Sequence, residues 1–250
     1  MHIGLLAAMP EELGQILDNI NILETKKFGD LEIFSGYWIN DNNKKILLTV
    51  AWSGWGKVSA ARASTRLLSN AFNNCEIDFV IFTGVAGAVN KNLKQWDIVL
   101  SETIIQHDID ARPLFKKFVI PAIGEKKIKA KDNLINHFHK TLDKKETIPE
   151  LSTFGTLYKG LIATGDMFIS EKEKLNQLSE EIPDLLAVEM EGAAFAQVAY
   201  QENIDWIVIR VISDGAEDNA GQEFNEFLKK YQLKSWHLIK YLLNSFEVTN

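Results

Sequence analysis

The chain of 250 residues contains a single cysteine, Cys75. It can therefore form no disulfide within itself, and it cannot build the metal sites that need several cysteines. The 27 Lys and Arg residues are outnumbered by 34 Asp and Glu residues, which gives a net charge of −7. An acidic chain without a long basic run is a poor binder of nucleic acid, so we expect no nucleic-acid partner.

Long hydrophobic runs are also missing, since no run approaches the roughly 20 apolar residues of a transmembrane helix. The first residues, MHIGLLAAMPEEL, have no basic start, and their short apolar run leads into acidic residues. They are typical of a first β-strand and not of a signal peptide. We therefore expect a cytoplasmic protein with no membrane partner.

Two segments have a superficial likeness to ligand-binding motifs. Residues 52–59, WSGWGKVS, lack the first glycine of a phosphate-binding P-loop, and Val58 stands where Ser or Thr would hold magnesium. His107 in the segment HDID has no second His or Cys cluster to complete a metal site, so a structural or interface role is preferred. We expect no metal and no cofactor.

The composition, 46% hydrophobic and 24% charged, is that of an ordinary globular protein, and the length suits one α/β domain over residues 1–250. Short apolar runs alternate with helical patterns, which favours a mostly parallel, twisted sheet with helices on both faces. The expected strands are 3–9, 46–52, 78–83, 97–109, 156–164, 185–190 and 206–213. One helix is expected from Pro10 through Leu17, and a last one from about Phe224 to Ser245.

Polar or glycine residues stand at the carboxyl ends of six of these strands. They are Glu12, Ser53, Gly84–Gly87, Asp166, Glu191 and Asp214. In open α/β sheets, ligands bind outside the carboxyl ends of the strands. The sequence therefore predicts one polar site at one edge of the sheet.

In several of its segments the chain resembles the bacterial methylthioadenosine/S-adenosylhomocysteine nucleosidases, within the wider purine nucleoside phosphorylase superfamily. The matching segments run in order from residue 3 to residue 224. They are IGLLAAMPEE, SGWGKVSAA, FTGVAGAV, HDID, GLIATGDMFI, AVEMEGAA and VIRVISDGA, followed by Phe224. The resemblance implies a single-domain, three-layer α/β/α fold with a central twisted mixed sheet, like that of the nucleoside phosphorylases. It implies hydrolysis of the N-glycosidic bond of an adenine nucleoside, with water as the nucleophile.

Such a cleavage passes through an oxocarbenium-like sugar, with the leaving base protonated and a water activated, tasks that suit carboxyl groups. The resemblance implies that Asp214 protonates adenine N7, that Glu12 activates water and that Arg210 helps to hold Glu12 and the water. As alternatives, Asp214 could simply cap a helix, and Arg210 could form a salt bridge on its strand. Charge at a helix start would suit Glu11 as well as Glu12, and only the resemblance chooses Glu12.

The resemblance also implies how the nucleoside is bound. Glu191 would accept hydrogen bonds from both ribose hydroxyls, whereas a simple helix-start charge is the alternative. Glu189, inside the preceding strand, is expected to be structural. The residues expected around the base, the ribose and its 5′ substituent are Met9, Trp55, Val85, Ala86, Gly87, Phe168, Ile169, Met190, Ser213 and Phe224. For the apolar members of this set, core packing is the alternative.

Two other functions compete with the hydrolase. A phosphate-dependent purine nucleoside phosphorylase needs basic residues for phosphate, and arginine is the usual one. The phosphorylases that resemble this chain carry an arginine where Thr83 stands, and Glu11 and Glu12 would repel phosphate. A non-catalytic nucleoside-binding protein is the second alternative, although binding alone would not need Glu12, Glu191 and Asp214 together.

The chain departs from the family pattern near the 5′ pocket. Val85 replaces a common serine, and Trp55 replaces a smaller aliphatic residue, so we expect an altered 5′ specificity that disfavours a long homocysteine tail. The family also implies a homodimer in which a loop from the partner closes this pocket. The segment after HDID lacks the usual aromatic, glycine-rich sequence, and Ala111, Leu114 and Pro121 are the candidates for that contact.

Overall fold

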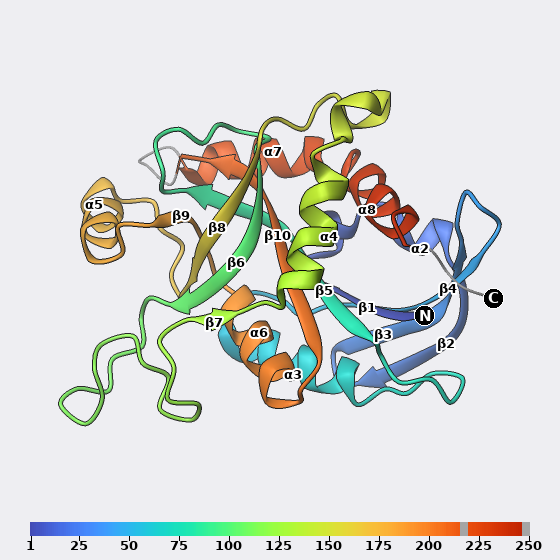
Figure 1. The fold of residues 1–250 in the computed structure, drawn as a ribbon, viewed down its shortest axis with the longest axis horizontal. Helices are drawn as coiled ribbons and strands as arrows, with labels where there is room; N and C mark the ends of the chain where they lie inside the picture. The colour runs from blue at the N-terminus through green and yellow to red at the C-terminus, as the bar shows by residue number, and fades with distance from the viewer. Residues whose placement is uncertain (216–219, 247–250) are drawn as a thin grey trace.

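In the computed structural model, which describes residues 1–215 and 220–246, ten strands form one sheet with helices on both sides (Figure 1). The strands are β1 (His2–Ala7), β2 (Asn21–Phe28), β3 (Leu31–Ile39), β4 (Lys45–Trp52), β5 (Phe79–Ala88), β6 (Ile98–Gln106), β7 (Ile128–Lys129), β8 (Leu157–Thr164), β9 (Leu185–Glu189) and β10 (Asp205–Asp214). The expectation of an α/β fold with a mixed sheet is confirmed.

The helices are mostly short. They are α1 (Pro10–Leu13), α2 (Ile16–Asn19), α3 (Lys57–Leu68), α4 (Asp132–Leu142), α5 (Lys172–Glu181), α6 (Gly192–Gln201), α7 (Ala220–Tyr231) and α8 (Ser235–Asn244), with two 3₁₀ turns at Lys145–Thr147 and Pro149–Leu151. Helices α3 and α6 pack against each other near the bottom of Figure 1, whereas α7 and α8 lie toward its top. Both groups cover apolar strand faces, which is why β1, β5 and β10 are buried along nearly their whole length.

Part of the sheet closes on itself. The strands run in the order β10-β6-β8-β9-β5-β1-β4-β3-β2, and β10 also pairs with β5. The five strands β5, β6, β8, β9 and β10 thus form a closed ring. The pairs β5–β10, β6–β8 and β8–β9 are parallel, and β6–β10 and β5–β9 are antiparallel. Closure brings the ends of β9 and β10 to the end of β5, although they are far apart in the sequence.

The hairpin of β2 and β3 was not among the expected strands. It extends the sheet in the antiparallel sense beyond β4. Strand β2, NILETKKF, is mostly exposed and polar, because it lies at the edge of the sheet. An edge strand with few buried positions lacks the apolar pattern by which strands are recognised.

Two helices expected to be continuous are each broken in two. The first breaks at Gly14, which has φ of 56° and lies so close to Ser235 and the carbonyl of Gln232 that a Cβ would collide with both. The last breaks between Tyr231 and Ser235, where α8 begins. The two predictions of single helices were therefore wrong, because α1 and α8 approach each other closely at Gly14 and the chain must turn there.

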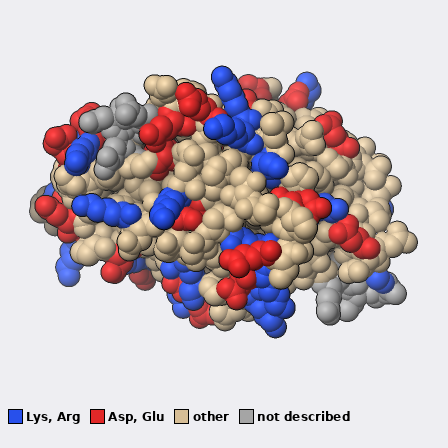
Figure 2. All heavy atoms as spheres, turned by 90° about the horizontal axis from the view of Figure 1, so that it is seen from above, with Lys and Arg blue, Asp and Glu red and all other residues tan. Residues whose placement is uncertain are grey.

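The surface is mixed in charge. On the face shown in Figure 2, Lys and Arg side chains intermingle with Asp and Glu side chains among the atoms that are described. Within residues 1–215 and 220–246, no helix has both the length and the apolar character needed to cross a membrane.

Candidate functional site

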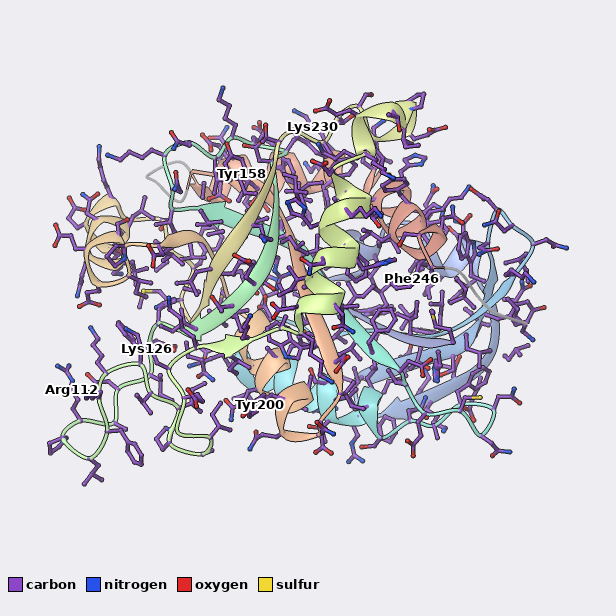
Figure 3. The ribbon with its side chains drawn as sticks, viewed as in Figure 1. Arg112, Lys126, Tyr158, Tyr200, Lys230 and Phe246 are labelled. Atoms are coloured by element: carbon purple, nitrogen blue, oxygen red, sulfur yellow. The ribbon has the colours of Figure 1, made fainter. Side chains whose placement is uncertain are left out.

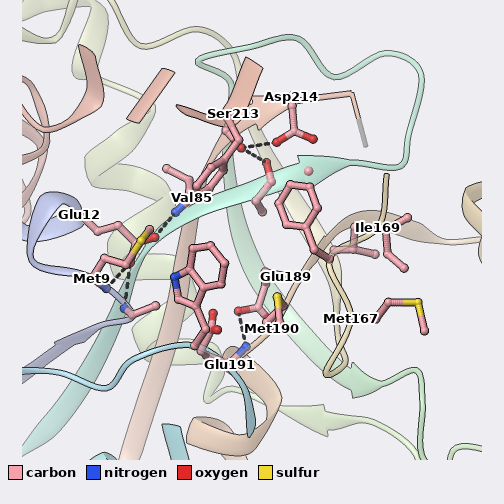
Figure 4. Close-up of a pocket in the computed structure, with 17 residues that line it drawn as sticks. Met9, Glu12, Val85, Met167, Ile169, Glu189, Met190, Glu191, Ser213 and Asp214 are labelled. Carbon is pink, nitrogen blue, oxygen red and sulfur yellow. Dashed lines mark hydrogen bonds between the residues drawn. The ribbon is translucent and has the colours of Figure 1, made fainter. Parts of the chain in front are cut away.

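A pocket of about 550 Å³, counted out to its open mouth, lies at the end of the closed ring of strands. Its walls come from the residues after β1 and β4, from the second half of β5, from the residues after β8, from the ends of β9 and β10, and from α7. Figure 4 shows Met9 and Glu12 on one wall, Ser213 and Asp214 on another, and Glu189, Met190 and Glu191 on a third. The expected convergence of strand ends is what forms this site.

Glu12 is held tightly at the start of α1. Its Oε2 accepts hydrogen bonds from the backbone N–H of Ala8 (2.8 Å) and Met9 (3.0 Å), and its Oε1 accepts one from Val85 N–H (2.9 Å). The carboxyl group is buried, and burial raises its pKa above the usual range, opposed by the nearby Arg210 and by the three N–H donors. Glu12 is therefore fixed in orientation, and its raised pKa makes the carboxylate a better proton acceptor than an exposed one.

The glycine segment GVAGA is part of strand β5. The sequence had instead suggested that the strand ends at residue 83 and that this segment follows it. Val85 to Gly87 pair with the end of β10 and Gly87 also pairs with β9, which keeps the backbone extended. Gly84 has φ of 150°, and a Cβ there would collide with Glu12 Oε1 and with the guanidinium of Arg210. The glycine thus allows both charged groups to lie against the strand.

Arg210 lies fully buried behind the pocket and does not line it. It forms an ion pair with Glu189, donates a hydrogen bond to Thr83 O (3.2 Å), and lies 3.8 Å from Glu191 Oε2. Its Nε, also buried, has no hydrogen-bond partner among the described residues. Glu189 in turn accepts hydrogen bonds from the Thr164 hydroxyl and from the first N–H groups of α6. The salt bridge weighed as an alternative for Arg210 is thus present, and it lies within the site.

Glu191 stands between β9 and α6 with an unusual proton affinity. Burial and the neighbouring carboxylate of Glu189 raise the pKa of Glu191 to about 8, against the opposing effects of Arg210 and of the Gly56 N–H. That N–H donates to Glu191 Oε1 at 2.8 Å and ties the segment after β4 to this wall. A carboxyl group with this pKa can offer both an acceptor and a donor near neutral pH.

Ser213 and Asp214 end β10, and both are buried. The Ser213 hydroxyl donates to Asp214 Oδ2 at 2.6 Å, and it also lies 3.2 Å from Ala86 O. A serine hydroxyl can rotate between two acceptors and can also accept a proton itself. The Ser213 hydroxyl can therefore form a hydrogen bond with the Asp214 carboxyl group in either of its protonation states.

The predicted residues fall into three groups. All the predicted binding residues, and Glu12 and Asp214, line the pocket: Met9, Glu12, Trp55, Val85, Ala86, Gly87, Phe168, Ile169, Met190, Glu191, Ser213, Asp214 and Phe224. Arg210 lies behind it, and three of the predicted strand-end residues, Ser53, Gly84 and Asp166, do not line it. Ala111, Leu114 and Pro121 lie away from it, on the segment marked by Arg112 and Lys126 in Figure 3, where Leu114 is 85% exposed.

Sequence reasoning missed four lining residues, Ala8, Met167, Val188 and Glu189. Ala8 and Met167 are direct neighbours of the selected Met9 and Phe168, and Val188 lies two residues before the selected Met190, so these positions were the available signal. Glu189 was assigned a structural role, and the only hint of another was its place two residues before Glu191. Among the residues that the structure describes, no group of His, Cys, Asp and Glu is arranged to hold a metal ion.

Comparisons with known proteins agree on one family. The model of the Phosphorylase superfamily matches residues 2–244. The chain is 36% identical to a 5′-methylthioadenosine/S-adenosylhomocysteine nucleosidase of Haemophilus influenzae (strain PittGG), over 91% of this chain and 92% of that protein. It is 33% identical to the protein of the same name from Staphylococcus saprophyticus, over 97% and 99% of the two chains.

Solved structures show the same likeness. The nucleosidase of Neisseria meningitidis in complex with methylthio-immucillin-A matches with a TM-score of 0.85 and 27% identity, over 98% of this chain and 99% of that one. A futalosine hydrolase of Helicobacter pylori matches with a TM-score of 0.83 and 29% identity, over 98% of both chains. The same fold therefore occurs in hydrolases that are named for different nucleosides.

Proposed function

This chain belongs to the family of 5′-methylthioadenosine/S-adenosylhomocysteine nucleosidases, and from that premise we propose that it hydrolyses the N-glycosidic bond of 5′-substituted adenine nucleosides. The products would be adenine and the 5′-substituted ribose. The resemblance found in the sequence is confirmed by these relatives. The observation that carries the proposal is the placement of Glu12, Glu191 and Asp214, all buried, on three walls of one pocket.

Glu12 is proposed to activate the attacking water. The three backbone donors fix both of its oxygens, and the Arg210 guanidinium lies on the same side of Gly84 as Glu12 Oε1. Burial raises the pKa of Glu12, so its carboxylate is a better proton acceptor than an exposed one. The Arg210 guanidinium would stabilise the carboxylate before it takes the proton and would help to orient the water.

Asp214 is proposed to protonate N7 of the leaving adenine. As a neutral acid it can carry its single proton on Oδ1, from which the proton passes to N7, while Oδ2 accepts a hydrogen bond from the Ser213 hydroxyl before and after the transfer. Ser213 is thus proposed to position Asp214 in both states. Phe168 and Ile169, on the segment after β8, are proposed to hold the base between them and the end of β10.

Glu191 is proposed to bind the two ribose hydroxyls, and the neighbouring Met190 and Met9 to pack against the sugar and its substituent. Val85, Ala86 and Gly87 present backbone groups to the nucleoside from β5. As the sugar becomes positively charged in the transition state, the nearby carboxyl groups of Glu12 and Glu191 would stabilise it.

Water is favoured over phosphate as the nucleophile. Among the described residues that line the pocket, none is Lys or Arg, whereas four are Glu or Asp. Thr83 occupies the position before Gly84 and is buried in β5. A phosphate dianion in this pocket would lack a cationic partner and would face several carboxyl groups.

The test is product analysis with purified protein and 5′-methylthioadenosine or S-adenosylhomocysteine. We expect adenine and free 5′-substituted ribose at a rate that added phosphate does not increase. Formation of a ribose 1-phosphate that depends on phosphate would identify a phosphorylase. Tight nucleoside binding without release of adenine would identify the non-catalytic alternative.

We further propose that the protein acts in the cytoplasm as a homodimer. The segment with Ala111, Leu114 and Pro121 would meet the pocket mouth of the second copy, supported by the exposure of Leu114 and Phe115. Sedimentation of the wild type and of Leu114→Asp tests this, since the charge would weaken a contact centred on Leu114. A wild-type monomer would contradict it.

A further inference from the structure

The mouth of the pocket has an aromatic wall built from three separate elements, namely Trp55, Phe168 and Phe224. Phe224 from α7 lies edge-on to Trp55, with ring centroids 6.1 Å apart, and edge-on to Phe168 at 5.7 Å. All three side chains line the pocket. Edge-to-face contacts of this kind stabilise the arrangement of the rings as well as the area that they bury. The three rings therefore act as one apolar surface.

Trp55 is held in place by the backbone that follows it. Gly56 N–H donates to Glu191 Oε1 at 2.8 Å, and Lys57 N–H donates to Asp166 Oδ1 at 2.7 Å. The Lys57 ammonium forms an ion pair with Asp108, whose other oxygen accepts from Asp166 N–H at 2.9 Å. Trp55 is 51% exposed, so it does not serve mainly as core packing.

The wall stands beside the proposed ribose site. Gly56, next to Trp55, contacts Glu191, which is proposed to hold the ribose hydroxyls, so a 5′ substituent would extend along the aromatic wall. The ionisable side chains that line the described part of the pocket are all carboxylic acids: Glu12, Glu189, Glu191 and Asp214. A charged substituent here would lose hydration against aromatic rings, and a carboxylate would also lack a cationic partner.

We propose that Trp55 and Phe224, the two rings of the aromatic wall that are not assigned to the base, make this enzyme select nucleosides with an uncharged, apolar 5′ substituent over those with an amino-acid tail. The proposal rests on the proposed nucleosidase activity and specifies its substrate class. The homocysteine tail of S-adenosylhomocysteine carries an ammonium and a carboxylate, whereas methylthio and longer alkylthio groups carry neither. Charge, and not length alone, is the property that the wall excludes.

The test compares kcat/KM for three adenine nucleosides that differ only at the 5′ position: methylthio, n-butylthio and homocysteinyl. The butylthio chain has the same backbone length as the homocysteinyl tail but no charge. We expect the two alkylthio substrates to agree within about fivefold and the homocysteinyl substrate to be at least about 30-fold poorer. In Trp55→Ala, the ratio of kcat/KM for the methylthio substrate to kcat/KM for the homocysteinyl substrate should fall by about fivefold or more, because the smaller side chain leaves the charged tail in water. The kcat/KM for the butylthio substrate should fall as well, because its chain loses an apolar contact.

Val58→Ala is the matched control, since Val58 lies on the same segment, is 80% exposed and does not line the pocket. Its substrate preferences should equal those of the wild type. The proposal is overturned if the wild-type kcat/KM values for the homocysteinyl and methylthio substrates agree within about threefold. It is also overturned if folded Trp55→Ala has the same ratios of kcat/KM between substrates as the wild type. Failure of the nucleosidase function itself would look different, because no substrate would then release adenine.

Discussion

Two buried polar networks of this protein differ in whether their charged and hydrogen-bonding groups are all paired. Near the amino end of β1, His2 Nε2 bonds to Thr49 Oγ1 (2.8 Å), Thr49 to Ser35 Oγ (3.0 Å), and Asn70 Nδ2 donates to Ser35 (3.0 Å). Lys26 closes the chain by donating to Asn70 Oδ1. Every link joins a donor to an acceptor between neighbouring elements of the fold, and none of these residues lines the main pocket.

The network at the carboxyl ends of the strands is different. It gathers Glu12, Glu189, Glu191 and Arg210, three carboxyl groups for one guanidinium. Burial raises the pKa of Glu12 and of Glu191, and Arg210 Nε has no partner among the described residues. A buried network that pairs all its groups stabilises the fold, whereas an unbalanced one beside a cavity is prepared for chemistry. The predictions below test this contrast.

The largest effect is expected at the end of β10. Asp214→Asn removes the proposed acid, and kcat for adenine release should fall by about 1,000-fold, within the range for general acids. The control is Asp205→Asn at the start of the same strand, where Asp205 pairs with Lys131 on the surface. Steady-state kinetics should show near wild-type turnover for the control. A folded Asp214→Asn variant that turns over normally would contradict the acid role.

Next in size is the effect at the start of α1. Glu12→Gln cannot accept a proton from water, so kcat should fall by about 100-fold or more. Glu11→Gln is the matched control, since Glu11 precedes it on the same helix and does not line the pocket. If instead Glu11→Gln were the inactive variant, the assignment that the sequence left open would be reversed.

The third prediction concerns the dependence of stability on pH. Because the pKa of Glu191 is raised to about 8, the folded protein binds this proton more tightly than the unfolded chain does. The wild type should then lose stability as pH rises from about 4.5 to about 8, and Glu191→Gln should not share that loss. At about pH 8.5 the variant should be more stable by up to ~4 kcal/mol, or roughly 8–16 °C in Tm, with little difference near pH 5.

Thermal unfolding across this pH range is the measurement. Glu202→Gln, at the exposed far end of α6, serves as the control and should follow the wild-type curve. A Glu191→Gln curve parallel to the wild type would mean that Glu191 is already ionised at neutral pH.

The smallest effect should appear in the paired network. Thr49→Val leaves His2 Nε2 without its hydrogen-bond partner and removes one of the two partners of Ser35 Oγ, so the free energy of unfolding should fall by about 1–2 kcal/mol. The kcat/KM of the folded variant should stay within about twofold of the wild type, because the network does not reach the pocket. Denaturant titration and kinetics measure the two effects separately. A large loss of activity without a loss of stability would contradict the assignment of this network to stabilising the fold.

Much of the sheet could be predicted because strands such as β5 and β10 are buried apolar runs of strand length followed by polar residues or glycine. Placing polar residues at strand ends also predicted most of the pocket. The edge strand β2 could not be found, since its exposed positions carry no apolar pattern. Two breaks, at Gly14 and before Ser235, depend on contacts between distant segments, which local patterns do not encode.

The pairing of Arg210 with Glu189 was beyond the sequence for a related reason. The two residues lie on β10 and β9, which do not pair directly and meet only because the ring of strands closes. Sequence spacing gives neither that closure nor the burial that follows from it. The roles of Glu12, Glu191 and Asp214 came from the resemblance, and burial adds a reason why the pKa values of Glu12 and Glu191 lie above those of exposed carboxyl groups.

The most direct test of the central claim is to follow the oxygen that attacks the sugar. Purified protein is incubated with 5′-methylthioadenosine in ¹⁸O-labelled water, with and without phosphate, and the sugar product is analysed by mass spectrometry immediately after each early turnover. We predict free methylthioribose that carries one ¹⁸O atom at C1, formed at the same rate with and without phosphate. Unlabelled sugar phosphate, or no cleavage unless phosphate is added, would contradict it.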